Sequence, residues 1–144
     1  MILSRSATYG LRAVLYLSLH TQDGVRFGVK NIAQELDLPE SYLGKVLQNL
    51  VRKGIISSTK GPRGGFYIEG QCLKRPVIGI VEAIDGLDRF SACGLGLNEC
   101  SDENPCSIHK EYGALRDGLF KLLSEKTISD FKKDIEEGKA IIAL

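Results

Sequence analysis

The sequence lacks the features of a membrane-spanning, secreted or disordered chain. Only four of its 144 residues are proline, and 43% are hydrophobic against 26% charged, which is typical of a globular protein. Its longest nearly apolar stretch, Ala13 to Leu19, contains Ser18 and is far shorter than the roughly 20 residues that cross a bilayer. No small-residue cleavage site follows this stretch, so a secretory signal is not expected. We therefore expect a cytoplasmic chain without membrane contact, forming one domain or a small domain with an appendage.

Signatures of catalysis are also missing from the sequence. No nucleophile, base and orienting group form a recognisable triad, no acid pair has an identifiable geometry, and no cofactor fingerprint is present. The Gly-rich segment Lys60–Gly65 lacks the strand, Gly-x-x-x-x-Gly-Lys and helix order of a phosphate-binding P-loop. We therefore do not expect an enzyme, and we identify no small-molecule substrate.

Charge is divided unevenly along the chain, although the net charge is only +1. Residues 1–75 hold eleven Lys and Arg against five Asp and Glu, whereas residues 76–144 hold eight against thirteen. An excess of positive charge favours contact with a polyanion. We therefore divide the chain into a basic part, 1–75, that meets a polyanion and an acidic part, 76–144, with another role.

The basic part has the pattern of three helices. Apolar residues recur at helical spacing over Ser4–His20, which is apolar nearly all round, and over Val29–Leu36. A third helix, Glu40–Lys53, starts after a proline and ends before Gly54, as helices commonly do. The short turn between the second and third helices is typical of a helix-turn-helix.

The third helix has one apolar and one polar face. The apolar face holds Leu43, Val46, Leu47, Leu50 and Val51, and the polar face holds Ser41, Lys45, Gln48 and Arg52. Hydroxyl, amide, ammonium and guanidinium groups, with no acid among them, are donors that read base edges and phosphates in a major groove. A solvated surface has the same pattern, so the DNA interpretation depends on the segment that follows.

That following segment predicts a basic hairpin. Two short apolar runs, Ile55–Thr59 and Phe66–Ile68, flank the segment Lys60–Gly65. Its three glycines permit close approach of the backbone, and Lys60 and Arg63 supply positive charge. A helix-turn-helix followed by such a hairpin predicts a winged helix that binds double-stranded DNA.

The acidic part predicts a short helix, Pro76–Leu87, a loop, Asp88–Asn104, and an amphipathic helix, Ile108–Leu123. One face of the last helix holds Tyr112, Leu115, Leu119, Leu122 and Leu123. This stripe is too long for the acidic part to cover alone, so either a partner helix in a two-fold dimer or the chain's own winged helix covers it. The expected fold class is mostly α with a small β wing: a winged helix-turn-helix plus a C-terminal helical dimerisation and cysteine-loop region. The cysteine loop is the segment that contains Cys93, Cys100 and Cys106.

Three of the four cysteines lie close together in the sequence. Cys93, Cys100 and Cys106 are separated by six and five residues, and His109 follows after two more. In a cytoplasmic chain this pattern indicates metal binding or redox chemistry rather than a disulfide framework. Structural zinc sites favour Cys pairs two to four residues apart, which are missing, whereas iron-sulfur clusters tolerate wider spacing. The spacing leaves both open, and Cys72 has the pattern of a small buried hydrophobe.

The chain resembles the Rrf2 family of bacterial winged-helix transcriptional regulators over nearly its full length. The resemblance is carried by Met1–Ser4, Tyr9-Gly10, Ile32-Ala33, Ser41-Tyr42-Leu43, Gly54–Ser58 and Gly61–Phe66, followed by the cysteine loop. It implies a DNA-binding homodimer with Glu40–Lys53 as recognition helix and Lys60–Gly65 as a wing that probes the minor groove. Gly44 and Lys45 stand where some members carry a base-reading acid, so the operator sequence does not transfer. The expected DNA-binding residues are Ser41, Tyr42, Lys45, Gln48, Arg52, Lys60 and Arg63.

The resemblance also implies an iron-sulfur cluster, as in the IscR- and NsrR-like branch of the family. Its ligands here would be Cys93, Cys100, Cys106 and His109. The first Cys interval is one residue longer than in IscR-like members and closer to that of members whose fourth ligand is an N-terminal carboxylate. No acid precedes Asp23, and Thr8 occupies the place of that carboxylate, so the histidine route and a 2Fe-2S cluster are favoured.

Two functions follow from the sequence and the resemblance. The first is a homodimeric transcriptional regulator in which occupancy or redox state of the cluster re-orders the Asp88–Asn104 loop and biases DNA binding. The second is a metal-free regulator controlled by thiol oxidation or by a partner protein.

Overall fold

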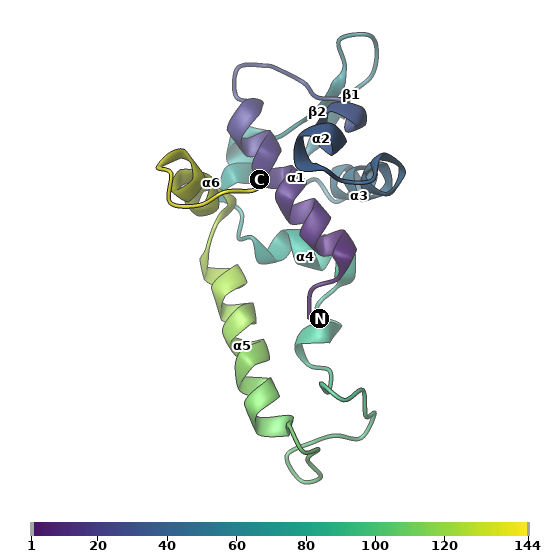
Figure 1. Cartoon of the computed structure of the whole chain (residues 1–144), viewed down its shortest axis with the longest axis vertical. Coiled ribbons are helices and arrows are strands. Elements are labelled where there is room, and N and C mark those ends of the chain that lie inside the picture. The colour runs from purple at the N-terminus through teal and green to yellow at the C-terminus, as the bar shows by residue number, and fades with distance from the viewer. Residues whose placement is uncertain (1, 144) are drawn as a thin grey trace.

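A computed structural model describes residues 2–143 as an elongated molecule, with the wing at one end and the cysteine loop at the other (Figure 1). Most helices gather around the wing end, and one long helix extends away from them to the loop. In chain order the elements are α1 (Arg5–His20), α2 (Val29–Leu36), α3 (Glu40–Arg52), β1 (Ser57–Thr59), β2 (Gly65–Tyr67), the 3-10 helix η1 (Gly70–Lys74), α4 (Ile78–Asp85), the 3-10 helix η2 (Asp88–Phe90), α5 (His109–Glu125) and α6 (Ile128–Glu136).

Helix α1 is the centre of the core. Ser4 caps its N-terminus by accepting a hydrogen bond of 3.0 Å from the Ala7 backbone amide. Helices α2, α3, α4 and α6 all contact α1, so Val14 and Leu17 are fully buried. The nearly all-round apolar pattern of this segment is explained because the helix is covered from several directions.

The helix-turn-helix forms within one residue of the predicted bounds. Asp37 ends α2 in the left-handed conformation, with φ 52°, and Leu38 N–H bonds to the Ala33 carbonyl oxygen at 2.9 Å. Helix α3 ends at Arg52 rather than Lys53, which is its C-cap. The apolar face of α3 packs into the core through Leu43, Val46, Leu47 and Leu50, while Val51 is half-buried.

The wing is a hairpin of two three-residue strands; β1 is shorter than the predicted run Ile55–Thr59, and β2 begins and ends one residue before Phe66–Ile68. Ser57 pairs with Tyr67 and Thr59 with Gly65. Phe27, in the connector after α1, exchanges backbone hydrogen bonds of 3.0 and 2.7 Å with Phe66 and so adds a third segment. A Cβ on Gly65 would lie 2.7 Å from the Phe27 backbone, and its φ is 142°. This glycine therefore allows close approach of the chain's own connector.

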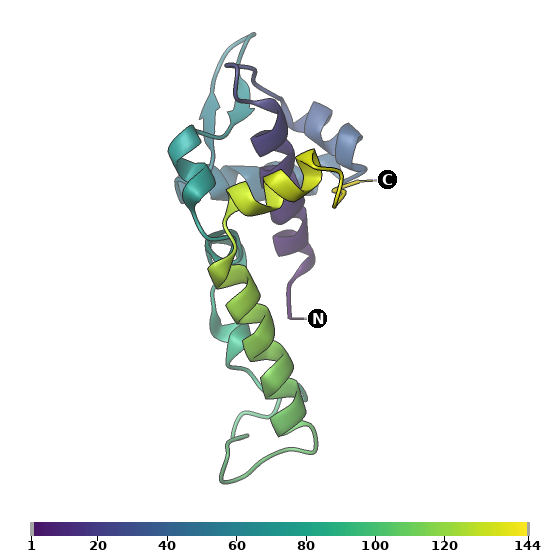
Figure 2. The ribbon, with the colours of Figure 1, turned by 90° about the vertical axis from the view of Figure 1, so that its left-hand side faces the viewer.

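Helix α6 and η1 are elements that the sequence patterns missed. A capping box at Thr127 and Asp130 starts α6, which crosses α1 and packs against it (Figure 2). The segments entering α4 and α6 also pair, because Val77 N–H bonds to the Lys126 carbonyl oxygen at 2.8 Å. The chain thus returns from α5 to the core around α1.

The expected fold class is confirmed: the structure is mostly helical with one small two-stranded antiparallel sheet. Within residues 2–143, none of the helices combines the length and the apolar character needed to cross a membrane.

Candidate metal centre and nucleic-acid interface

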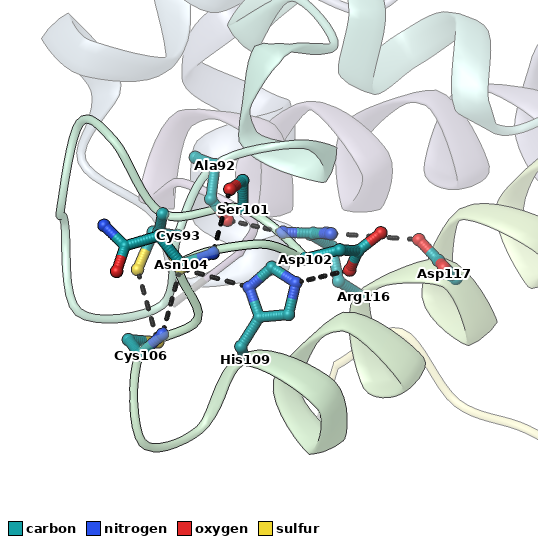
Figure 3. Close-up of polar contacts among 10 residues, drawn as sticks. Ala92, Cys93, Ser101, Asp102, Asn104, Cys106, His109, Arg116 and Asp117 are labelled. Carbon is teal, nitrogen blue, oxygen red and sulfur yellow. Dashed lines mark hydrogen bonds and ion pairs between the residues drawn. The ribbon is translucent and has the colours of Figure 1, made fainter.

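The structure brings the three loop cysteines together. The sulfur atoms of Cys93, Cys100 and Cys106 all lie within 4.8 Å of one another, and each side chain is half-buried. Cys93 Sγ is 3.6 Å from Cys106 Sγ (Figure 3). Three thiols at such distances form a donor set for a soft metal or an iron-sulfur cluster.

His109 joins this group from the first turn of α5. Its Nδ1 is 3.0 Å from Cys100 Sγ. Its Nε2 is 2.9 Å from an Asp102 carboxylate oxygen (Figure 3). When Nε2 donates its proton to Asp102, Nδ1 is left with a lone pair for a thiol proton or a metal, which is the usual arrangement at histidine ligands. Asp102 escaped the sequence analysis because Glu99 and Glu103 flank it in the same loop and nothing local separates the three acids.

The three thiols differ in acidity. The Leu97 backbone amide lowers the pKa of Cys93 to about 7 from its usual 9.0, with burial opposing and the Leu95 amide, 3.4 Å from the sulfur, assisting. At Cys100 the Cys106 backbone amide lowers the pKa, but burial and the neighbouring thiols outweigh it and raise the pKa. Of these two thiols, Cys93 therefore has the larger thiolate fraction near neutral pH.

The donor set fits the group that the resemblance implies. Three thiols and one imidazole match an iron-sulfur cluster in which histidine replaces one cysteine, and they also match a zinc site of the Cys3His type. Cys72 lies apart from them in η1, is 8% exposed, and donates to the Gly54 carbonyl oxygen at 3.7 Å. This burial agrees with its interpretation as a packing residue.

The polar face of α3 lines an open groove beside the wing. The groove has a volume of about 980 Å³ and is lined by Val29, Glu40, Ser41, Gly44, Lys45, Gln48, Arg52 and Phe66. Four predicted DNA-binding residues therefore share one surface, and all four are exposed. Glu40, from the first turn of α3, also lines the groove. The observed surface therefore carries an acid, whereas the polar face predicted from the sequence had none.

Tyr42 faces a different surface from these four residues. Its hydroxyl lies 2.6 Å from the Ser6 hydroxyl, and its ring packs edge-on to Tyr9 with centroids 5.6 Å apart. Lys60 and Arg63 are exposed at the tip of the hairpin, where Gly64 N–H closes a turn onto the Gly61 carbonyl oxygen at 2.9 Å. The predicted DNA contacts thus come from three places: the groove, the N-terminal end of α3, and the wing tip.

The predicted apolar stripe of α5 divides between the chain's own core and solvent. Leu123 is buried and Leu119 packs against the core, which the sequence alternatives had allowed. Leu115 and Leu122, however, are 71% and 47% exposed. The chain's own fold therefore covers only one edge of the stripe and leaves two leucines in solvent.

Comparison with known proteins gives consistent matches over the chain. Residues 3–134 match the Rrf2 family, described as an iron-dependent transcriptional regulator. A relative from Aquifex aeolicus (strain VF5), named as a helix-turn-helix-type transcriptional regulator, is 32% identical over 132 residues, covering 90% of each chain. The regulator IscR of Yersinia pestis is 25% identical over 130 residues, covering 90% of this chain and 78% of the relative.

Solved structures with similar folds cover most of the chain. CymR, the global cysteine regulator of B. subtilis, superposes with a TM-score of 0.71 at 21% identity, covering 91% of this chain and 95% of CymR. IscR of T. potens superposes with a TM-score of 0.70 at 24% identity, covering 96% of this chain and 91% of IscR. At these identities the similarity supports the winged-helix fold.

Proposed function

The chain belongs to the Rrf2 family of iron-dependent transcriptional regulators, and from this membership we propose that it is a homodimer whose DNA affinity is controlled by an iron-sulfur cluster, of the 2Fe-2S type, in the cysteine loop. It is a regulator and not an enzyme, in agreement with the expectation from the sequence. Its proposed partners are double-stranded DNA and a second copy of the chain, in the cytoplasm. The proposal involves neither a membrane nor a small-molecule substrate.

The convergence of Cys93, Cys100 and Cys106 is the observation that carries this proposal, because sulfurs within 4.8 Å of one another are a ready donor set in a family described as iron-dependent. An iron-sulfur cluster can be oxidised and reduced, and it is lost when iron is removed. In the proposal the three thiolates hold that group, and His109 is the fourth ligand. Asp102 would fix the ring of His109 by accepting the Nε2 proton.

DNA binding is assigned to the predicted residues of α3 and the wing. Lys45, Gln48 and Arg52 line one exposed groove, so a duplex lying there meets ammonium, amide and guanidinium groups together. Lys60 and Arg63 at the wing tip extend the positive surface toward the phosphate backbone. Glu40, in the same groove, is an acceptor suited to a cytosine amino group.

Dimerisation is assigned to the outer edge of α5. Leu115 and Leu122 are exposed on the long helix that leads away from the core, and a second copy related by a two-fold axis covers both. In such a dimer two recognition helices face one duplex, so the operator is expected to be two-fold symmetric.

A metal-free thiol switch is the second candidate. The 3.6 Å between the Cys93 and Cys106 sulfurs favours it, as does a Cys93 pKa of about 7. Among the structures with this fold is S. aureus CymR in an oxidized form, with a TM-score of 0.71. In this candidate the same loop senses oxidants without metal.

Anaerobic purification followed by absorption spectroscopy and assays of iron, sulfide and zinc distinguishes the candidates. We expect sulfur-to-iron charge-transfer bands, and a change in DNA affinity when a chelator removes the iron. Affinity is measured on a duplex selected by the protein from a random pool. Colourless protein with stoichiometric zinc contradicts the cluster, and colourless metal-free protein with oxidant-sensitive DNA binding supports the thiol switch.

A further inference from the structure

Arg116, on α5, holds the backbone immediately before Cys93. Its Nη1 donates a hydrogen bond of 2.6 Å to the Ala92 carbonyl oxygen (Figure 3). The bond joins residues 24 positions apart, and the Arg116 side chain is only 17% exposed. The cysteine loop is therefore attached to α5 at a point next to a thiol of the candidate site.

The backbone immediately after Cys93 is held by the same helix. A Cβ on Gly94 would lie 2.8 Å from a ring carbon of Tyr112 and 2.9 Å from Ile108 Cδ1, so the loop backbone rests directly on these side chains. The Arg116 guanidinium lies 5.9 Å from the Tyr112 ring centroid, within cation–π range. Cys93 is thus fixed on both sides by residues of α5, which also carries His109.

The positive charge of Arg116 is only weakly compensated. Its Nε is buried and has no hydrogen-bond partner within residues 2–143. The carboxylate of Asp117 is 4.0 Å from that Nε, and the Asp117 side chain is 77% exposed, so water screens it. An unpaired buried N–H is costly, and Arg116 lines one pocket together with Cys106 and His109.

We propose that Arg116 is a positioning residue of the cysteine site, which fixes Cys93 on α5 and places a permanent positive charge beside the bound anionic cluster. The charge favours the reduced cluster, which carries one more electron, and so raises the reduction potential. The predicted effect of Arg116 on the reduction potential rests on the proposed function, because it needs a bound cluster. The effect of Arg116 on the backbone at Cys93 does not need a cluster and can be measured in the metal-free chain.

Two substitutions separate position from charge. Arg116→Met keeps an unbranched apolar stem but removes the hydrogen bond and the charge. Arg116→Lys keeps the charge and the stem but lacks the planar fork that reaches the Ala92 carbonyl oxygen. Arg89→Met is the matched control, because it removes an exposed positive charge from the start of the same loop.

With the iron-loaded protein we measure the rate at which a chelator bleaches the visible bands, and the midpoint potential by redox titration. Arg116→Met should bleach about tenfold faster than the unsubstituted protein and have a lower potential. Arg116→Lys should bleach faster at a nearly unchanged potential, and Arg89→Met should match the unsubstituted protein in both. An unchanged potential in Arg116→Met overturns the charge role, and unchanged bleaching in both Arg116 variants overturns the positioning role.

Amide hydrogen exchange of the metal-free protein tests positioning without a cluster. Both Arg116 variants should exchange faster over residues 91–97, while Arg89→Met should not. If the unsubstituted protein takes up no iron-sulfur cluster, the proposed function and the charge role fail, whereas the exchange data still decide the positioning role. Unchanged exchange in Arg116→Lys, which keeps the packing stem, overturns that role even if Arg116→Met does not fold.

Discussion

Asn49 and Ala83 connect α3 to α4, the helix that leads into the cysteine loop. The Asn49 side-chain amide, on α3, donates a hydrogen bond of 2.9 Å to the Ala83 carbonyl oxygen in the last turn of α4. Two residues later, Asp85 accepts a hydrogen bond of 3.1 Å from the backbone amide of Ser4, the N-cap of α1. The end of α4 therefore contacts both α3 and α1 immediately before the chain enters η2 and the loop.

Asn49→Ala tests whether this contact carries the regulatory signal. We expect the difference in DNA affinity between cluster-loaded and cluster-free protein to shrink, because the hydrogen bond that joins the end of α4 to α3 is lost. The loss of one hydrogen bond should cost about 1 kcal/mol in the free energy of unfolding. Binding titrations of both forms measure the effect, with the exposed Gln34→Ala as control; an undiminished difference in Asn49→Ala excludes this route.

The wing tip should contribute affinity without sequence selectivity. Arg63→Ala or Lys60→Ala should weaken binding to all duplexes and reduce the slope of log affinity against log salt by about 1, because each removes one phosphate contact. Gln48→Ala, in the groove, should instead change the preferred base. Lys121→Ala, on α5, is the charge-matched control. Affinity that does not fall between about 50 and 200 mM salt contradicts the basic surface.

Leu115→Asp should produce a folded monomer. Leu115 is 71% exposed in the single chain, so the aspartate costs the monomer little, whereas in a dimer interface it buries an unpaired charge. Sedimentation and circular dichroism measure assembly and folding together. Ile141→Asp, at a residue that is 70% exposed near the C-terminus, is the control and should leave assembly unchanged. A Leu115→Asp protein that sediments as a dimer places the interface elsewhere.

Local patterns predicted the helices of residues 1–75 well, since these elements have local signals. Apolar spacing together with Pro39 and Gly54 located α3 within one residue of its observed end. The same reasoning missed Arg116 and Gly94, whose importance comes from contacts between the loop and α5. It also treated the α5 leucines as one face, because periodicity does not show that α4 and η2 pack against α5 and cover only one edge of the stripe.

Mild oxidation of the metal-free protein should join Cys93 to Cys106. The Cys93 thiolate attacks hydrogen peroxide to give a sulfenic acid and hydroxide, and Cys106 then attacks that sulfur to form the disulfide with release of water. Because the Cys93 pKa is about 7, the rate should rise with pH through 7 and level off above it. Mass spectrometry of alkylated peptides identifies the pair. Cys100→Ser should still form it, and a dominant Cys93 to Cys100 disulfide in the unsubstituted protein would contradict the pairing.

The ligand set itself is tested by replacing each donor and recording the visible spectrum. Replacement of Cys93, Cys100 or Cys106 by Ala should give colourless protein, because a thiolate that donates strongly to iron is lost. His109→Cys should keep a cluster at a lower reduction potential, since a charged thiolate replaces a neutral imidazole and disfavours the added electron.

Cys72→Ser is the matched control for these cysteine substitutions. Cys72 lies in η1, and its sulfur faces the Gly54 carbonyl oxygen rather than the loop, so the spectrum should be unchanged. Because Cys72 is only 8% exposed, a hydroxyl in its place should destabilise the fold and lower the midpoint of thermal unfolding. The two readouts separate packing from ligation at a single residue. If the visible bands are lost in Cys72→Ser but kept when Cys93 is replaced, iron is held by a different set of residues. The three converging loop sulfurs are then not the ligand set.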